Sequence, residues 1–355
     1  TYEKLKPIYA ILDLIPSLTK ELVSLGEEIT LHNVSPLVSM YQAMLPSALK
    51  SKYYKDYIVI DENMLSEGLK TLVKGGVLYA DKALDYHQKE LKRLLQKGSI
   101  KPNYKIKSVA SKNFDKYIEL VDDNPVLRGV KQKACLEALL AETKILKSTL
   151  VHEYNIGNST ITSLIKKGVI KETLEEKYRD IETIYEVNDK EVTLTSSQQQ
   201  VFEQVKKSLN QYQTFLLHGV TSSGKTEVYL RLIEACIKRG KEAILLVPEI
   251  SITPMMVARF RGAFEDQVAV LHSGLSIGEK YDEWRKIRRK EVKVVIGARS
   301  AIFAPFENLG IIILDEEHSD TYKQDTSPMY HAKDVAMLRS KHYQVPLVLG
   351  SATPS

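Results

Sequence analysis

The sequence predicts a multidomain protein in which a mainly helical N-terminal region with a winged helix precedes an α/β lobe built on a parallel sheet. Three observations predict this arrangement. The 355 residues exceed the roughly 150 of a typical domain. After about residue 189, helical periodicity gives way to short apolar strands that alternate with helices, which is typical of a parallel sheet. That second part also contains a G-x-x-x-x-G-K-T phosphate loop.

The composition is that of a soluble globular protein and excludes several classes. Hydrophobic residues make up 43% and charged residues 27%, and the net charge of +5 is compatible with nucleic acid as a partner. Cys135 and Cys236 lie far apart, which excludes a disulfide scaffold or a cysteine-built zinc site and fits a reducing, cytoplasmic compartment. No apolar run has the length of a membrane span, so we expect no membrane partner. The chain begins at Thr1 without a leader-like segment, and a start without Met indicates residues missing upstream.

Residues 1–51 are predicted to be mainly helical, and only the family resemblance of the later motifs implies that they are the helical end of an N-terminal DNA-binding region. A helical stretch at 4–15 stops at Pro16, and Thr19 can cap a second helix with an apolar stripe at Leu22, Val23 and Leu25 before Gly26. The string 45–47 contains a proline that marks another break. We interpret these helices as packing elements.

Residues 52–185 are predicted to hold the winged helix. A pattern recurs at 72–78, 94–100 and 164–170, in which apolar residues end a helix, lysine occupies its last turn, and glycine leads into a strand. The third copy follows helices expected near 130–141 and 147–153, and three short helices before a strand are the layout of a winged helix. Lys166, Lys167 and Lys171 could contact DNA phosphates. A protein-contact or spacer module is the open alternative.

Residues 186–355 are predicted to form the α/β lobe, entered through an acidic, polar linker at 183–189. Its apolar strands are bounded by turn residues and alternate with helical segments. They are expected at 214–218, 243–247, 268–271, 292–296, 311–314 and 347–349.

The first of these strands runs directly into the phosphate loop. Glycines let successive backbone N–H groups turn toward an anion, and the helix expected at 227–238 points its positive end there. Lys225 would reach the β and γ phosphates of ATP, and Thr226 would place its hydroxyl on Mg²⁺. The predicted ATP-binding residues of the loop are Gly219, Val220, Thr221, Ser222, Ser223, Gly224, Lys225 and Thr226.

An acidic string follows the strand expected at 311–314. A carboxylate at the carboxyl end of a parallel strand lies where such sheets bind ligands. Asp315 can hold Mg²⁺, and Glu316 can position or deprotonate the attacking water, so Lys225, Asp315 and Glu316 are the predicted catalytic residues. An acidic loop after a core strand is the alternative.

A third element, 350–354, leaves the last strand, and its small hydroxyl residues could relay the state of the nucleotide. In this order and spacing, the three elements resemble the first, RecA-like motor lobe of superfamily 2 helicases. By the same resemblance Gln198 matches the motif with which many such lobes read adenine. A helix-capping polar stretch is the alternative there.

Longer strings resemble the PriA family of primosomal replication-restart helicases (primosomal protein N′). They are 219–230, 246–254, 296–306, 315–318 and 330–336, and the similarity is dense from about 194 to 355 and looser over 1–190. The resemblance implies an ATP-dependent 3′→5′ DNA helicase that recognises stalled or abandoned replication forks and initiates primosome assembly. The implied partners are forked and single-stranded DNA, single-strand binding protein, and primosome or helicase-loading proteins.

The resemblance also implies an aromatic-rich loop at about 319–331 that couples single-stranded DNA to ATP hydrolysis. Aromatic faces stack on bases without reading sequence, and lysine holds phosphates. Tyrosines packed into the lobe are the alternative. The string 248–250 with Thr253, and the string 297–300, match further strand-tracking motifs, in which Arg299 would add a charge for DNA phosphates. The DNA-coupling residues implied in this way are Tyr322, Lys323, Gln324, Tyr330, His331, Ser351, Thr353 and Arg299.

The chain ends directly after the last motif of the first lobe. The family's second lobe, which supplies an arginine finger, and its zinc region lie outside this chain. We therefore expect a fragment that needs ATP and Mg²⁺ for its site but hydrolyses little ATP alone; zinc is implied only by the family. Two alternatives stay open: another superfamily 2 DNA translocase, or a non-catalytic docking fragment for partner proteins.

Overall fold

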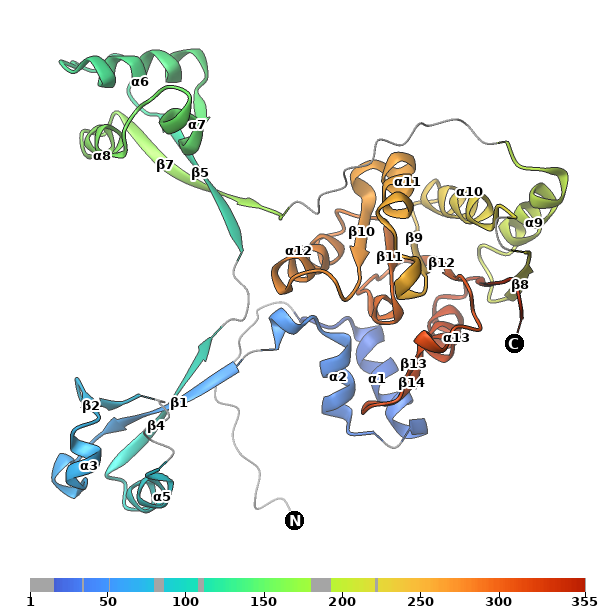
Figure 1. Ribbon diagram of the computed structural model, residues 1–355, viewed down its shortest axis with the longest axis horizontal. Helices are drawn as coiled ribbons and strands as arrows, with labels where there is room; N and C mark the ends of the chain where they lie inside the picture. Colours follow the sequence, from blue (N-terminus) through green and yellow to red (C-terminus); the bar gives the residue numbers. More distant parts are fainter. Residues whose placement is uncertain are drawn as a thin grey trace. The chain divides into compact units, whose positions relative to one another are not determined.

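A computed structural model describes residues 16–33, 35–50, 52–79, 86–107, 112–179, 193–220 and 223–354 (Figure 1). The helical stretch expected at 4–15 and the linker expected at 183–189 lie outside the described residues. The chain divides into two compact units, one made of Thr1–Ala110 with Glu182–Ser355 and the other of Ser111–Ile181. No helix in the described ranges is long and apolar enough to span a bilayer.

The α/β lobe is built on a six-stranded parallel sheet, as predicted. Its strand order is β10-β11-β9-β12-β15-β8. Because parallel strands end at the same edge of a sheet, the loops that follow β8, β12 and β15 meet there. The strands are β8 (Thr214–His218), β9 (Glu242–Leu246), β10 (Val268–Leu271), β11 (Val294–Gly297), β12 (Leu309–Leu314) and β15 (Leu347–Ser351).

Helices cover both faces of this sheet, which explains why its central strands are apolar throughout. α9 (Ser196–Lys207), α10 (Lys225–Ile237) and α11 (Pro254–Phe264) share one core with Ala243 and Leu245 of β9. α12 (Ile277–Arg288) and α13 (Ala332–Tyr343) share the other core with Ile244 and Leu246. Successive residues of β9 therefore enter opposite layers, as the two-residue period of a strand requires.

Two N-terminal helices, α1 (Lys20–Asn33) and α2 (Leu37–Met44), pack into the same lobe. Thr19 caps α1 as predicted, because its hydroxyl accepts a hydrogen bond from the Leu22 N–H at 3.1 Å. The helix continues through Gly26, where a Cβ would lie 2.6 Å from the Tyr41 ring. Glycine thus permits the close crossing of α1 and α2. Leu22 and Met40 are fully buried in the core that also contains helix α13.

A buried ion pair joins α1 to α13. Arg339 is fully buried, and its Nε and Nη2 atoms donate to the Glu21 carboxylate at 2.9 and 3.0 Å. Its Nη1 atom donates to the carbonyls of Ile302 and Ala304 at 2.6 and 3.0 Å. A buried charge needs such a full set of partners. The described part of the N-terminal segment is therefore integral to the lobe.

Residues 52–107 form a small module with its own core. Its antiparallel sheet has the order β2-β3-β1-β4, and Leu69, Leu78, Leu91 and Leu94 are among its buried residues. The elements are β1 (Lys52–Val59), η3 (Glu62–Met64), α3 (Glu67–Lys70), β2 (Val73–Lys74), β3 (Val77–Leu78), α5 (Gln88–Gln96) and β4 (Ile100–Lys107).

The prediction of a helix end at 72–78 was wrong. Helix α3 has already ended at Lys70, and β2 and β3 form a hairpin whose turn is Gly75-Gly76, with φ of 58° and 76°. Two successive residues with positive φ are what a two-residue hairpin turn demands, and a glycine pair supplies them without strain. The glycines therefore serve a turn between strands instead of a helix cap.

The unit Ser111–Ile181 contains three helices and an antiparallel sheet of order β6-β5-β7. The helices lie where the sequence predicts them, and strand β5 before them was not predicted. The span predicted as one winged helix thus holds two modules with separate cores. The elements are β5 (Asn113–Leu120), α6 (Val130–Ala141), β6 (Lys144–Leu146), α7 (Lys147–His152), α8 (Asn158–Lys166) and β7 (Ile170–Lys177).

The two modules repeat one arrangement. In each, an eight-residue first strand pairs along its whole length with an eight-residue last strand. The end of one strand faces the start of the other, Val59 opposite Ile100 and Leu120 opposite Ile170. The helix before the last strand, α5 or α8, is followed by a glycine with φ of 73°. The recurrence at 94–100 and 164–170 therefore reflects a repeated module.

Candidate functional site

The phosphate loop joins β8 to α10 at the carboxyl edge of the sheet (Figure 1). Gly224 has a φ of 80°, a left-handed conformation that favours glycine, and helix α10 begins at the next residue. At Gly219 a Cβ would lie 2.7 Å from the Ser223 hydroxyl, so a larger residue there would displace the Ser223 side chain. The predicted ligands Thr221 and Ser222 lie outside the described residues. The rest of the loop is compatible with a phosphate at the N-terminus of α10.

Lys225 lies between the loop and the acidic string. Its Nζ atom donates to the Gly219 carbonyl at 2.9 Å and lies 3.4 Å from Oε1 of Glu316, and the side chain is only 9% exposed. Residues from the ends of two different strands thus converge on one place, as their positions in a parallel sheet predict. Glu316 adopts a φ of 46°, and such strain in a non-glycine residue is typical of functional loops.

Two tyrosines donate hydrogen bonds to Asp315, a role that the sequence did not predict for either of them. The Tyr229 hydroxyl donates to Asp315 Oδ1 at 2.8 Å, and the Tyr322 hydroxyl donates to the Asp315 carbonyl at 2.6 Å. Burial raises the pKa of Asp315, while the hydrogen bond from Tyr229 opposes this rise. Burial and the neighbouring Asp315 charge also raise the pKa of Tyr229, so its hydroxyl stays a donor. The position of Tyr229, one turn after Lys225 in α10, was the available signal in the sequence.

The segment 350–354 contacts both the phosphate loop and the acidic string 315–318. The Gly219 N–H donates to the Ser351 carbonyl at 3.0 Å, and the Glu317 N–H donates to the Gly350 carbonyl at 2.9 Å. A Cβ at Gly350 would collide with the Tyr229 hydroxyl. The chain at 350–351 therefore contacts both the phosphate loop and the acidic string.

His318 connects the acidic string to the hydroxyl residues of 350–354. Its Nδ1 atom lies 2.8 Å from the Ser351 hydroxyl, and its Nε2 atom lies 3.5 Å from that of Thr353. In the sequence, His318 was evident only as the last residue of the string 315–318. These contacts give the predicted relay residues Ser351 and Thr353 a physical link to the carboxylates.

Gln198 has the helix-capping role that the sequence left open, and it also contacts the phosphate loop. With Thr195 it forms a capping box at the start of α9, which is the helix-capping alternative. Its Nε2 atom also donates to the Ser223 carbonyl of the phosphate loop at 2.9 Å. The side-chain amide of Gln198 therefore forms hydrogen bonds with both the phosphate loop and the start of α9.

The donor atoms at this edge suit a nucleotide with magnesium. The Thr226 hydroxyl and the Asp315 carboxylate are hard oxygen donors of the kind that Mg²⁺ prefers. Among the described residues no group of three or more His, Cys, Asp or Glu side chains could hold a metal by itself. A magnesium ion here would therefore take its other ligands from nucleotide phosphates and water.

Base stacking by the tyrosines of the 319–331 loop is contradicted by their burial. Tyr322 is fully buried and Tyr330 is 5% exposed, so neither ring offers a free face. Tyr330 packs edge-on against Phe303 with centroids 5.0 Å apart. The alternative of tyrosines packed into the lobe is therefore correct in this structure. The loop includes η7 (Asp320–Tyr322), β13 (Lys323–Gln324) and β14 (Tyr330–His331).

The other predicted DNA-coupling residues of this region shape the loop. Arg299 donates to the Lys323 carbonyl, and Gln324 Nε2 donates to the Pro328 carbonyl at 2.8 Å. His331 Nδ1 accepts the Lys333 N–H at 3.1 Å and caps α13, and burial lowers the pKa of this imidazole. Lys323 is exposed and pairs with Asp325 at 3.0 Å.

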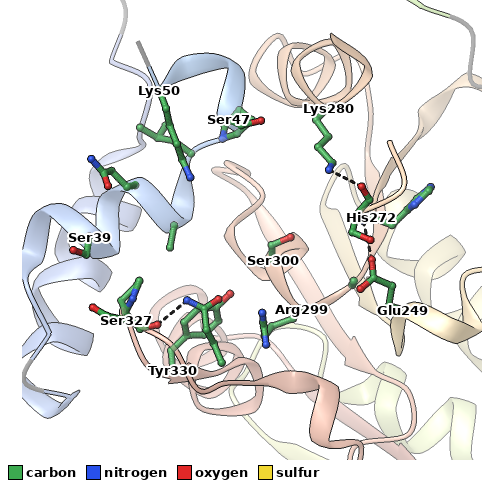
Figure 2. Close-up of a pocket in the computed structure, with 18 of the residues that line it drawn as sticks. Ser39, Ser47, Lys50, Glu249, His272, Lys280, Arg299, Ser300, Ser327 and Tyr330 are labelled. Atoms are coloured by element: carbon green, nitrogen blue, oxygen red, sulfur yellow. Dashed lines mark hydrogen bonds between the residues drawn. The ribbon is translucent and has the colours of Figure 1, made fainter. Parts of the chain in front are cut away.

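A cleft of about 750 Å³ lies next to this loop (Figure 2). Figure 2 shows Ser39, Ser47 and Lys50 on one wall and Glu249, His272 and Lys280 on the other, with Arg299 between them. The first wall comes from α2 and η2 (Ser47–Leu49), which the sequence analysis treated as packing helices without chemistry. Three permanent cations, Lys50, Lys280 and Arg299, line the cleft with a single carboxylate, that of Glu249.

Contacts among these side chains order the second wall of the cleft. Lys280 Nζ donates to the Ser273 carbonyl at 2.8 Å, and the Ser273 N–H donates to Glu249 at 2.9 Å. Hydrogen bonds from the side chain and the N–H of Ser273 lower the pKa of Glu249, which keeps it ionised, and burial lowers the pKa of His272. The wall thus combines a fixed carboxylate with a mostly neutral imidazole and a lysine.

Comparisons with known proteins place these features among helicases. Residues 195–355 match the family model described as DEAD/DEAH box helicase. Over 99% of its length the chain is 45% identical to the replication restart protein PriA of Bacillus subtilis (strain 168), and it covers 46% of that protein. It is 49% identical over 56% of its length to the replication restart protein PriA of Synechocystis sp., and covers 24% of it.

Solved structures give a weaker match. RecG bound to a three-way DNA junction matches 46% of the chain and 21% of its own, with 24% identity and a TM-score of 0.35. The chain spans less than half the length of the curated relatives it matches.

Proposed function

The chain belongs to the PriA family and carries a DEAD/DEAH box helicase domain, and from this premise we propose that it supplies the first motor lobe of a replication-restart DNA helicase. The lobe would bind ATP with Mg²⁺ and use its hydrolysis to drive a 3′→5′ helicase at stalled or abandoned forks. Such a protein would work in the cytoplasm with forked and single-stranded DNA, single-strand binding protein, and primosome or helicase-loading proteins.

The observation that carries this proposal is the convergence of Lys225, Asp315 and Glu316 at one edge of one sheet. Lys225 would hold the β and γ phosphates, and Asp315 with Thr226 would hold the magnesium ion, whose charge neutralises the phosphate oxygens when it is bound. Glu316 would orient the attacking water or accept its proton. Gln198 would contact the adenine base of ATP.

The test is nucleotide binding and hydrolysis in Lys225→Ala. Calorimetry with a non-hydrolysable ATP analogue should show binding to the chain and none to the variant. Hydrolysis by a longer protein that contains this chain should fall by at least about 10²-fold, the usual loss for one transition-state donor. Lys238→Ala is the matched control, because this lysine directly follows the same helix as its C-cap residue and its side chain is 73% exposed. Equal nucleotide uptake by Lys225→Ala and the chain would contradict the proposal.

Single-stranded DNA is the ligand that best fits the cleft. Its cations and hydroxyls can hold phosphates without reading bases, and the cleft touches the 319–331 loop at Thr321 and Gln324. Between these two residues, Tyr322 reaches inward to the Asp315 carbonyl. We infer that a strand in the cleft acts on the acidic string through the position of Tyr322. Lys50→Gln with Lys280→Gln should then reduce the stimulation of hydrolysis by single-stranded DNA and leave unstimulated hydrolysis unchanged.

The unit Ser111–Ile181 is proposed to be a winged-helix variant. Its helices α6, α7 and α8 precede β7, the expected layout, although β5 comes before them and lies between β6 and β7. Of the three lysines predicted to contact phosphates, Lys171 pairs with Glu119 at 2.9 Å and Lys167 donates to Gln132 at 3.3 Å. A docking role for this unit is therefore the second candidate, since its sheet carries closely paired charges.

A further inference from the structure

Helix α5 of the 52–107 module has one buried face and one cationic face. Leu91 and Leu94 are buried in the core of the module. The opposite face carries a set of exposed cations, Lys89, Lys92, Arg93 and Lys97. These positions recur at three- and four-residue spacing, which places them side by side on a helix. We name these four residues the α5 basic face.

The α5 basic face contains no acid. Glu90, the one acidic residue of α5, turns toward the rest of the module, where it accepts hydrogen bonds from the N–H and the hydroxyl of Ser66, both at 2.9 Å. It also lies 3.4 Å from Nδ1 of His87. Within the described part of the chain, none of the four cations of the face forms an ion pair. Four like charges that repel one another over about 12 Å of helix have no structural use in the module.

The unit Ser111–Ile181 provides a comparison, because the lysines of its sheet form ion pairs within the unit. On the sheet of Ser111–Ile181, each lysine has a carboxylate partner from a neighbouring strand or helix. The pairs are Lys112–Glu176 at 3.1 Å, Lys116–Glu172 at 3.2 Å, Lys147–Glu172 at 2.6 Å, Lys171–Glu119 at 2.9 Å and Lys177–Asp115 at 3.6 Å. Four lysines surround Glu119 and Glu172 and neutralise them, namely Lys116, Lys144, Lys147 and Lys171. The same fold thus carries balanced charge in one copy and unbalanced charge in the other.

The repeat also gives α5 a defined place. It is the helix before the last strand, which is the place of α8 in the second module. In a winged helix the last helix before the final strands is the one that enters a DNA groove. An α-helix with side chains is about 10–12 Å across, close to the roughly 12 Å width of the major groove.

We propose that the α5 basic face binds the sugar-phosphate backbone of duplex DNA without reading sequence. The inference rests on the proposed function, because it names which part of the chain holds the double-stranded arm of a fork. Residues 88–97 include no aromatic side chain, so the face lacks the stacking platform that single-strand binding requires. Lysine and arginine without protein partners are free to replace the counterions of the phosphates.

The test is the salt dependence of DNA binding by the whole chain. Fluorescence anisotropy with a labelled duplex of arbitrary sequence would compare the chain with Lys92→Gln/Arg93→Gln/Lys97→Gln. If three phosphate contacts are lost, the slope of log K against log salt should become shallower by about 2.7, since each contact contributes about 0.9. Between 50 and 200 mM salt, the chain should then lose about 40-fold more affinity than the variant.

Two control variants separate the face from bulk charge and from folding. Lys112→Gln/Lys116→Gln/Lys177→Gln removes the same number of charges from paired positions and should keep the slope. Lys92→Arg/Arg93→Lys/Lys97→Arg retains the charges and should keep it too. An unchanged slope in the first variant, an equal change in the paired-lysine control, or a loss of single-strand or oligoglutamate binding in place of duplex binding would overturn the proposal. Uptake of a non-hydrolysable ATP analogue, measured on the same samples, reports separately on the proposed function.

Discussion

Removing the hydroxyl of Tyr229 should change how the nucleotide site responds to pH. In the folded protein, burial raises the pKa of Asp315, and the hydrogen bond from Tyr229 at 2.8 Å counteracts part of this rise. Tyr229→Phe removes that bond without changing the packing of the ring. The pKa of Asp315 should therefore rise further, because its ionised form loses a donor.

The consequence has a definite sign. Magnesium needs the ionised carboxylate, so binding of a magnesium–nucleotide complex is lost as the pH falls through the pKa of Asp315. In Tyr229→Phe this loss should occur at a higher pH than in the unmodified chain. The free energy of unfolding should also fall by about 1.5–3 kcal/mol at pH values where Asp315 is ionised, since a hydrogen bond to a charged group is lost. The deficit should shrink at low pH, where the carboxyl is neutral.

Tyr322→Phe is the matched control. It also removes a hydroxyl that donates to Asp315, but the acceptor in this case is the backbone carbonyl and not the carboxylate. The cost should be about 0.5–1.5 kcal/mol, and the pH at which nucleotide binding is half lost should stay where it was. Calorimetric titrations with an ATP analogue and magnesium from pH 4 to 8, and urea unfolding at both ends of that range, measure these quantities. Superimposable pH profiles for Tyr229→Phe and the unmodified chain, or equal shifts in both variants, would refute the reasoning.

Two further predictions concern the rest of the chain. Arg339→Leu should lower the free energy of unfolding by about 3–5 kcal/mol in urea titrations, because it leaves the buried carboxylate of Glu21 without its partner. The double variant with Glu21→Leu should recover part of this loss, and no recovery would argue against the ion pair. The hydrogen bonds from Lys171, Thr173 and Lys144 lower the pKa of Glu119 from 4.5 to about 2. The stability that this carboxylate contributes to Ser111–Ile181 is therefore complete above pH 4.5 and lost as the pH falls toward 2, and Glu119→Gln should flatten that part of an acid-unfolding profile; an unchanged profile would contradict this.

The lobe could be predicted from the sequence because its determinants are local. Each strand is a short apolar run, and the phosphate loop and acidic string each directly follow such a run. Chain direction alone then brings Lys225 and Glu316 to the same edge of a parallel sheet. The capping of α1 by Thr19 was predictable for the same reason, since a cap involves only the first turn of a helix.

Long-range packing set the limit of prediction. Glu21 and Arg339 are far apart in sequence, and nothing near either residue indicates that the N-terminal helices join the lobe. The pattern at 72–78 looked like two other segments, but a second glycine and the shortness of α3 made it a hairpin. The two-module organisation of 52–177 depends on strand pairing between distant ends, which the sequence pattern does not reveal.

The burial of the loop tyrosines restricts how DNA could influence the nucleotide site in the proposed helicase. Had Tyr322 and Tyr330 been exposed, bases could have stacked on them, and coupling would have depended on base contacts. Instead the Tyr322 hydroxyl holds the Asp315 carbonyl, while the Tyr330 ring lies against Phe303 within the core. The neighbours of Tyr322 in the loop, Thr321 and Gln324, line the cleft. In the proposed helicase, a strand that moves this short segment would move Tyr322 with it, so coupling would rest on the position of the backbone and would not depend on the identity of the bases.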